Sequence, residues 1–148
     1  MPVLLVLAAT IRLYGVDFGL PALLDPDELM FELGAVQMLK SGSLNPGWFG
    51  HPATTTMYVL AVINASVFGV GWAAGLYQSP ADFMAAIYQN PSLLILPGRI
   101  SIVAFSILAI WQLKKLADPM MQGNAWIGSI FAAALLAFSP LYVQHSQI

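Results

Sequence analysis

The sequence contains no cysteine and very little charge. Its 148 residues include five Lys or Arg and seven Asp or Glu, so that 8% are charged while 59% are hydrophobic. The absence of cysteine excludes a disulfide framework, a thiolate nucleophile and a thiolate metal site. A formal net charge of -2 gives no support for a nucleic-acid partner. Soluble domains of this length are rarely so poor in charge, so the composition indicates a membrane protein.

Long apolar runs occupy much of the chain instead. Four stand out, at residues 2–11, 54–76, 92–113 and 125–143. A helix needs about 20 apolar residues to cross a bilayer. The first run is shorter, and it has neither a basic segment before it nor a small-residue cleavage site after it. We therefore interpret it as a retained span rather than a signal peptide, and expect the native N-terminus upstream.

The orientation depends on one basic pair. Lys114-Lys115 precedes the fourth run, in what we expect to be a loop reaching Asn124, and an excess of Lys and Arg is typical of cytoplasmic loops. If all four runs cross, the acidic region after the first run is cytoplasmic as well. If residues 54–76 lie along the interface, the loop of about residues 15–91 faces outward.

Residue types in the second run favour the interface, although its length and lack of charge fit a span. It contains three threonines, Asn64 and Ser66, and it ends near Trp72 and Tyr77, which are typical of membrane boundaries. The sequence thus predicts an all-α polytopic integral membrane protein with three spans plus juxtamembrane helices in the first outer loop. Four spans are the alternative.

Four of the seven carboxylates lie close together, at Asp25, Asp27, Glu28 and Glu32. The cluster has the pattern of a helix start, because Asp25 can cap, Pro26 suits the first position and Glu28 completes a capping-box spacing. One acid suffices for a cap, whereas adjacent acids repel one another unless a cation, a proton or a basic substrate group shares the site. Such a carboxylate could deprotonate a hydroxyl, or bind a metal that bridges to a phosphate.

The other expected helix ends follow the same logic. Lys40 and Gly42 suit the end of the helix that begins at Pro26, since a cation and a left-handed residue are favoured there. Ser79 and Pro80 predict the start of a second short helix that reaches Tyr88.

Five short motifs occur in the order found in one enzyme family. They are Arg12-Leu13-Tyr14-Gly15, Pro26-Asp27-Glu28 with Gly50-His51-Pro52, Gly98-Arg99-Ile100-Ser101, and Ser139-Pro140-Leu141-Tyr142-Val143-Gln144-His145-Ser146. With them the chain resembles the GT-C glycosyltransferases, closest to the branch of protein O-mannosyltransferases and aminoarabinose transferases. Family members are much longer, commonly with about ten or more spans, and carry a further acid after the Ser-Pro stretch. We therefore interpret residues 1–148 as the N-terminal part of one GT-C-like domain, incomplete as an enzyme.

The resemblance implies a membrane glycosyltransferase. A sugar would move from a polyprenyl-phosphate donor to a hydroxyl acceptor on a glycan, lipid or protein, at the outer face of a bacterial or archaeal plasma membrane. Asp27 would be the catalytic base with Glu28 beside it. The substrate-binding candidates are Asp25, Arg99, His51 and His145.

Several roles stay open at this level. No metal ligand is assigned, and a divalent metal is compatible with these residues without being required. Arg99 could contact a phosphate or pair with an acid. Arg12 could be an interfacial anchor or form an internal ion pair, or it could bind substrate. The alternative function is a non-catalytic polytopic membrane protein or assembly partner in which the acidic loop merely caps a helix.

Overall fold

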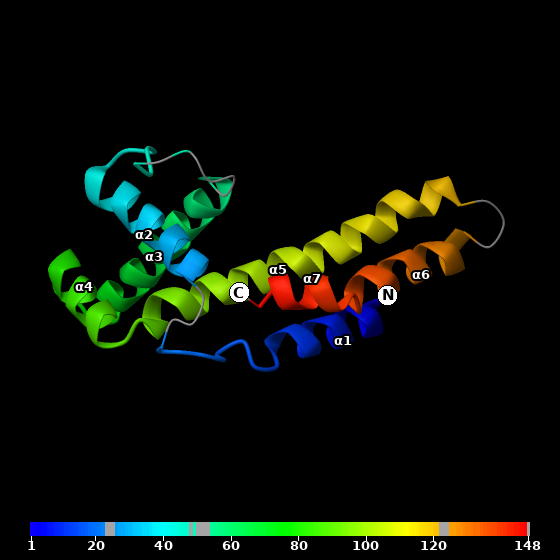
Figure 1. Ribbon diagram of the computed structural model, residues 1–148, viewed down its shortest axis with the longest axis horizontal. Coiled ribbons are helices and arrows are strands. Elements are labelled where there is room, and N and C mark those ends of the chain that lie inside the picture. Colours follow the sequence, from blue (N-terminus) through cyan, green and yellow to red (C-terminus); the bar gives the residue numbers. More distant parts are fainter. Residues whose placement is uncertain (23–25, 48, 50–53, 122–124, 148) are drawn as a thin grey trace. The chain divides into compact units, whose positions relative to one another are not determined.

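The computed structural model is entirely helical in the residues that it describes, which are 1–22, 26–47, 49, 54–121 and 125–147 (Figure 1). Helix accounts for 78% of the structure, and these residues contain no strand. The prediction of an all-α protein is confirmed.

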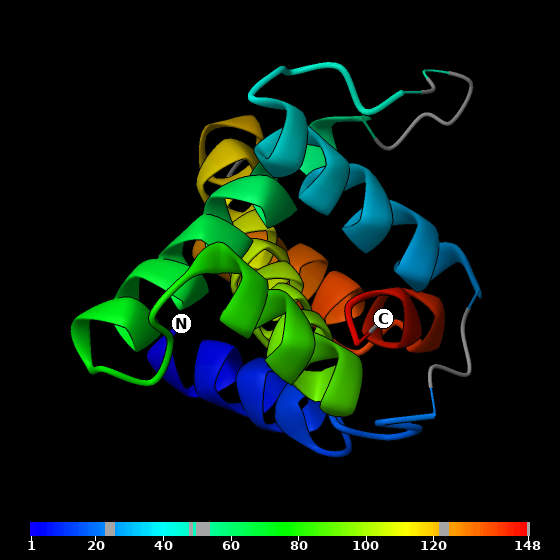
Figure 2. The same cartoon turned by 90° about the vertical axis from the view of Figure 1, so that its left-hand side faces the viewer.

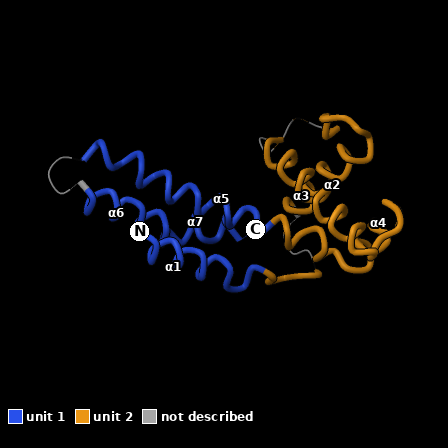
Figure 3. The backbone as a smooth tube through the Cα atoms, turned by 180° about the vertical axis from the view of Figure 1, so that it is seen from behind, with its two compact units in different colours: residues 1–16, 99–148 blue, residues 17–98 orange. Residues whose placement is uncertain are grey.

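The chain divides into two compact units (Figure 3). Unit 1 comprises residues 1–16 and 99–148, and unit 2 comprises residues 17–98. The boundary falls within the long helix α5 (Ser92–Ala117), directly after Pro97 and Gly98. Each unit has its own core and is described by itself.

Unit 1 is a helical bundle whose centre is built from small residues. Besides the larger part of α5, its elements are α1 (Pro2–Leu13), η1 (Asp118–Met120), α6 (Ala125–Ala137) and α7 (Pro140–His145). Ala8, Ala133 and Ala137 are fully buried and pack with Ile110 of α5. Small side chains let helix backbones approach closely, as is typical of helix packing in membranes.

Unit 2 contains α2 (Pro26–Ser41), α3 (Thr54–Ala73), α4 (Pro80–Gln89) and the first turns of α5. Helix α2 packs against α3 (Figure 2). Gly34 permits this approach, because a Cβ atom there would lie 2.7 Å from the Met57 sulfur. An aromatic cluster joins α3 to α4, with the Phe83 ring 5.5 Å from Phe68 and 4.9 Å from Tyr77.

The predicted helix ends in unit 2 are confirmed where the structure describes them. Helix α2 begins at Pro26, Lys40 lies in its last turn, and Gly42 follows with a left-handed φ of 63°. Helix α4 begins at Pro80, and the Ser79 hydroxyl accepts a hydrogen bond from the Asp82 amide at 3.2 Å. The proposed cap residue of α2, Asp25, lies outside the described residues.

The apolar run 125–143 contains a helix break, and one expectation about the residues before it is wrong. The apolar run 125–143 is not one helix, because α6 ends at Ala137 and Ser139 caps a separate helix α7. Pro140 explains the break, since proline disfavours helical geometry in the preceding residue and fits the first position of a new helix. Lys114 and Lys115 lie in the last turn of α5 rather than in a loop, and Lys114 pairs with Asp118 at 2.6 Å.

Within the described ranges, two helical stretches are long and apolar enough to cross a membrane, Thr54–Ala73 and Ser92–Met120. Helices α1 and α6 are apolar but have only 12 and 13 residues. The structure therefore agrees with a helical membrane protein in the length and composition of these two helices.

Candidate functional site

The carboxylates at the start of α2 differ in how far they are buried. Asp27 and Glu28 both lie in the first turn of the helix, where the unpaired backbone amides favour negative charge. Asp27 is exposed, whereas Glu28 is 8% exposed. The Asp27 side chain therefore lies on the exposed side of the helix, while Glu28 lies on its packed side.

Glu32 lies one helical turn after Glu28 and is buried, with 1% of its surface exposed. Its Oε2 accepts a hydrogen bond of 2.7 Å from the Asn64 amide nitrogen on α3. Gly98, in the first turns of α5, lies so close that a Cβ atom there would be 2.7 Å from Glu32 Oε1. Three helices of unit 2 thus meet around this one carboxyl group.

The environment of Glu32 favours its protonated form. The pKa of Glu32 is raised to about 7, chiefly by burial; the hydrogen bond from Asn64 lowers the pKa and the negative charge of Glu28 raises it. The group therefore changes charge near neutral pH while it remains inside the unit.

Sequence reasoning placed Glu32 in the acidic cluster but missed its pairing with Asn64. Part of the signal was available, because Glu28, Glu32 and Ala35 recur at the spacing of one helix face. Buried acids on that face require a polar partner on the helix that packs against it. Asn64, a polar residue near the middle of an otherwise apolar run, is this partner.

In unit 1 the structure buries Arg12 completely. Its Nη1 donates to the Ala8 oxygen at 3.2 Å and to the Ala137 oxygen, at the end of α6, at 2.9 Å. The guanidinium carbon lies 5.1 Å from the centre of the Tyr142 ring. Among the described residues, Arg12 Nε and Nη2 have no hydrogen-bond partner. The interpretation of Arg12 as an interfacial anchor is therefore wrong, and its contacts join three helices.

Gln147 adds hydrogen bonds between the end of the chain and the end of α1. Its amide nitrogen donates to the oxygens of Ile11, Arg12 and Tyr14 at 3.2, 3.1 and 2.9 Å, and so binds free carbonyl groups at the end of α1. Two of the motifs singled out in the sequence, the one at Arg12 and the one from Ser139 to Ser146, thus lie together in unit 1.

The remaining candidates are distributed over both units. Arg99 is 6% exposed in unit 1 and donates from Nη1 to the Val16 oxygen at 2.7 Å. His145 is exposed in the last turn of α7, also in unit 1. Asp27 and Glu28 belong to unit 2. Asp25 and His51 lie outside the described residues.

No metal centre is formed by the part of the chain that the structure describes. Within it, no group of three or more His, Cys, Asp and Glu side chains is arranged to hold a metal ion.

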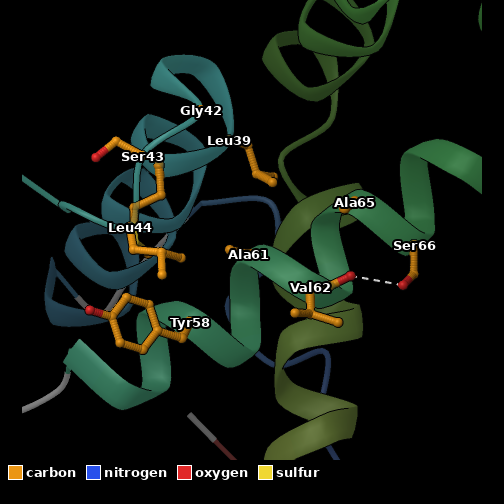
Figure 4. Close-up of a pocket in the computed structure, with 10 residues that line it drawn as sticks. Leu39, Gly42, Ser43, Leu44, Tyr58, Ala61, Val62, Ala65 and Ser66 are labelled. Atoms are coloured by element: carbon orange, nitrogen blue, oxygen red, sulfur yellow. Dashed lines mark hydrogen bonds between the residues drawn. The ribbon is translucent and has the colours of Figure 1, made fainter.

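A cavity of about 620 Å³ lies in unit 2 between the end of α2 and α3 (Figure 4). Ser43 and Leu44 border it after α2, and Tyr58 and Val62 border it from α3. The Ser66 hydroxyl in its wall already donates to the Val62 oxygen at 2.7 Å. None of the residues that line this cavity is charged.

Comparison of the chain with protein-family models, with curated proteins and with solved structures found no match. Any assignment of function therefore depends on the residues of this chain.

Proposed function

We propose that this chain is the N-terminal part of a membrane glycosyltransferase, with Asp27 as its catalytic base. The observation that carries the proposal is the exposed carboxylate of Asp27 on the first turn of α2, directly beside the buried Glu28. The resemblance of the short motifs to GT-C enzymes supplies the reaction class.

The proposed chemistry is the transfer of a sugar from a polyprenyl phosphate to a hydroxyl group. The acceptor oxygen attacks the anomeric carbon, the bond from that carbon to the phosphate oxygen breaks, and Asp27 takes the acceptor proton. The lipid phosphate leaves as an anion. Holding both substrates in line would supply much of the rate, as in other transfer reactions.

The packing of unit 2 supports the proposal that α3 lies along the interface. Helix α2 carries Asp27, Glu28, Glu32 and Lys40, and it packs along α3 through the bond from Asn64 to Glu32. If α3 crossed the bilayer, α2 would be drawn into the hydrocarbon, where each Asp or Lys costs about 3 kcal/mol. An interfacial α3 avoids this cost and leaves the three spans to α1, α5 and α6, with the acidic loop outside.

Asp27→Asn tests the proposal directly, because it removes the base with little change in volume. In membranes that contain the protein, transfer from a radiolabelled polyprenyl-phosphate sugar should fall by at least about 100-fold, the usual contribution of a general base. Asp82→Asn is the matched control, since Asp82 also lies exposed in the first turn of a helix. It should leave transfer unchanged.

Retained transfer in Asp27→Asn, at equal amounts of folded protein, would exclude Asp27 as the base. Equal losses in both variants would show that helix stability, and not proton transfer, limits the activity. The alternative, a non-catalytic assembly partner, predicts no transfer in any variant.

A further inference from the structure

The side-chain amide of Asn64 has a hydrogen bond on one side only. Its nitrogen donates to Glu32 Oε2 at 2.7 Å, whereas its Oδ1 has no hydrogen-bond partner in the described part of the chain. A buried acceptor without a donor is costly and rare. Less than 1 Å² of this oxygen is accessible, so its donor has to come from a side chain already packed against Asn64.

Glu32 is such a side chain. A carboxyl group that carries its proton has one hydroxyl donor as well as an acceptor oxygen. A carboxylic acid and a primary amide can therefore form two hydrogen bonds side by side. The amide nitrogen donates to one carboxyl oxygen, and the other carboxyl oxygen donates to the amide oxygen. An ionised Glu32 has no proton to donate and leaves Asn64 Oδ1 unpaired.

The groups around Glu32 also favour the protonated form. On its own helix, Glu28 lies one turn away and is itself buried. Helix α3 has Tyr58 as its only ionisable residue, and the part of α5 that belongs to unit 2 has none. Arg99, the next residue along α5, donates from Nη1 to the Val16 oxygen. Burial is the main reason why the pKa of Glu32 rises to about 7.

Three helices meet closely at this pair. Glu32 belongs to α2 and Asn64 to α3, and Gly98 of α5 lies so near that a Cβ atom there would be 2.7 Å from Glu32 Oε1. Ionisation of Glu32 in this place creates a buried charge beside a second acid and leaves the amide oxygen unpaired. Each of these effects weakens the contact between the helices.

We propose that Glu32 and Asn64 form a proton switch that controls the packing of α2 against α3 and the start of α5. With its proton, Glu32 makes two hydrogen bonds to Asn64, and the three helices pack tightly. When the pH rises, the proton passes to water, one of the two bonds is lost, and the junction loosens. This inference does not depend on the transferase activity, so either proposal can fail alone.

The first test is an infrared titration of the whole chain in micelles of an uncharged detergent, because protonated carboxyl groups and carboxylates absorb at different frequencies. Ordinary Asp and Glu side chains lose their protons near pH 4. We expect one carboxyl group that is still protonated at about pH 6 and loses its proton near pH 7. Its band should be absent in Glu32→Gln and present in Asp82→Asn, which removes an exposed acid from α4.

Hydrogen exchange, corrected for the intrinsic effect of pH, tests the change in packing. The opening constant of peptides from α2 should rise about tenfold for each pH unit between about 4.5 and 7. Glu32→Gln should abolish this slope, since a Gln side chain supplies both a donor and an acceptor and has no proton to lose. Peptides from α6, a helix without ionisable side chains in unit 1, should show no such slope.

Asn64→Asp tests the pairing itself. Two carboxyl groups that share a site hold one proton more firmly, so the midpoint of the titration should rise by at least about one pH unit. Asn45→Asp, at an exposed position after α2, is the matched control and should leave the midpoint unchanged.

The absence of a protonated carboxyl group at about pH 6 in the unaltered chain would contradict the proposal, and this result needs no variant that folds. A band that persists in Glu32→Gln would assign the proton to another acid. Titration of Glu32 without a change in the exchange of α2 would show that the proton does not control the packing. An unchanged midpoint in Asn64→Asp would contradict the role of Asn64.

Discussion

The two units bury ionisable groups of opposite sign. Unit 1 has four basic residues and one acid, a charge of +3, while unit 2 has one basic residue and six acids, a charge of -5. Unit 1 encloses Arg12 and unit 2 encloses Glu32. The two units differ in the groups that surround each of these buried side chains.

The hydrogen bonds of the Arg12 guanidinium go to backbone oxygens. Its guanidinium donates to the last carbonyl of α6, and it lies in the last turn of α1, so the negative ends of two helix dipoles act on it. Glu32 has one hydrogen bond from a neutral amide and a second acid, Glu28, one turn away. Unit 1 therefore surrounds its buried cation with backbone oxygens and an aromatic ring, whereas the surroundings of Glu32 in unit 2 favour its uncharged form.

The largest expected effect is the loss of the Arg12 charge. Arg12→Gln should destabilise unit 1 by about 4 kcal/mol, because two hydrogen bonds from a charged donor are lost. Hydrogen exchange of peptides from α1 and α6, followed by mass spectrometry, measures the effect. Unchanged protection of both helices would show that the Arg12 contacts contribute nothing.

The matched change in unit 2 should have the opposite sign. Because the folded state holds the proton of Glu32 up to about pH 7 and the unfolded chain releases it near pH 4.5, unfolding free energy should fall as pH rises between these values. Glu32→Gln removes this loss and should stabilise unit 2 at pH 8 by about 3 kcal/mol. Near pH 4 the variant and the original chain should be equally stable.

Detergent unfolding followed by circular dichroism at both pH values measures this difference. A destabilised Glu32→Gln at pH 8 would mean that the ionised carboxylate is the favoured state, and the contrast between the two units would be lost.

The smallest expected effect concerns the helix caps. Ser79 accepts from the Asp82 amide at 3.2 Å in unit 2, and Ser139 accepts from the Tyr142 amide at 3.5 Å in unit 1. Ser79→Ala should cost about 1 kcal/mol, and Ser139→Ala should cost less because its bond is long. Hydrogen exchange in α4 and α7 compares the two, and a larger effect at Ser139 would reverse the expected order.

Local chemistry in the sequence predicted several helix ends. The starts of α2 at Pro26 and of α4 at Pro80 follow from the fixed backbone of proline, and the hydroxyl of Ser79 acts within four residues. Such signals need no knowledge of the rest of the fold.

The buried polar contacts could not be predicted in this way. Arg12 bonds to Ala137, 125 residues away, and Glu32 bonds to Asn64, 32 residues away. These pairs depend on how the helices pack, which the apolar pattern of a membrane protein leaves open because every side of a helix is hydrophobic. Lys114 and Lys115 were assigned to a loop because they are charged, although they continue α5.

The central claim, that the acid-bearing unit 2 lies at the outer face of the membrane, is most directly tested by labelling single cysteines. The chain has no cysteine, so Ala81→Cys and Lys115→Cys each introduce one reactive thiol at an exposed position of unit 2 and unit 1 respectively. In intact cells an impermeant maleimide should label Ala81→Cys and should label Lys115→Cys only after the membrane is broken. Labelling of both from the same side would contradict the three-span topology and, with it, the outward-facing position of Asp27.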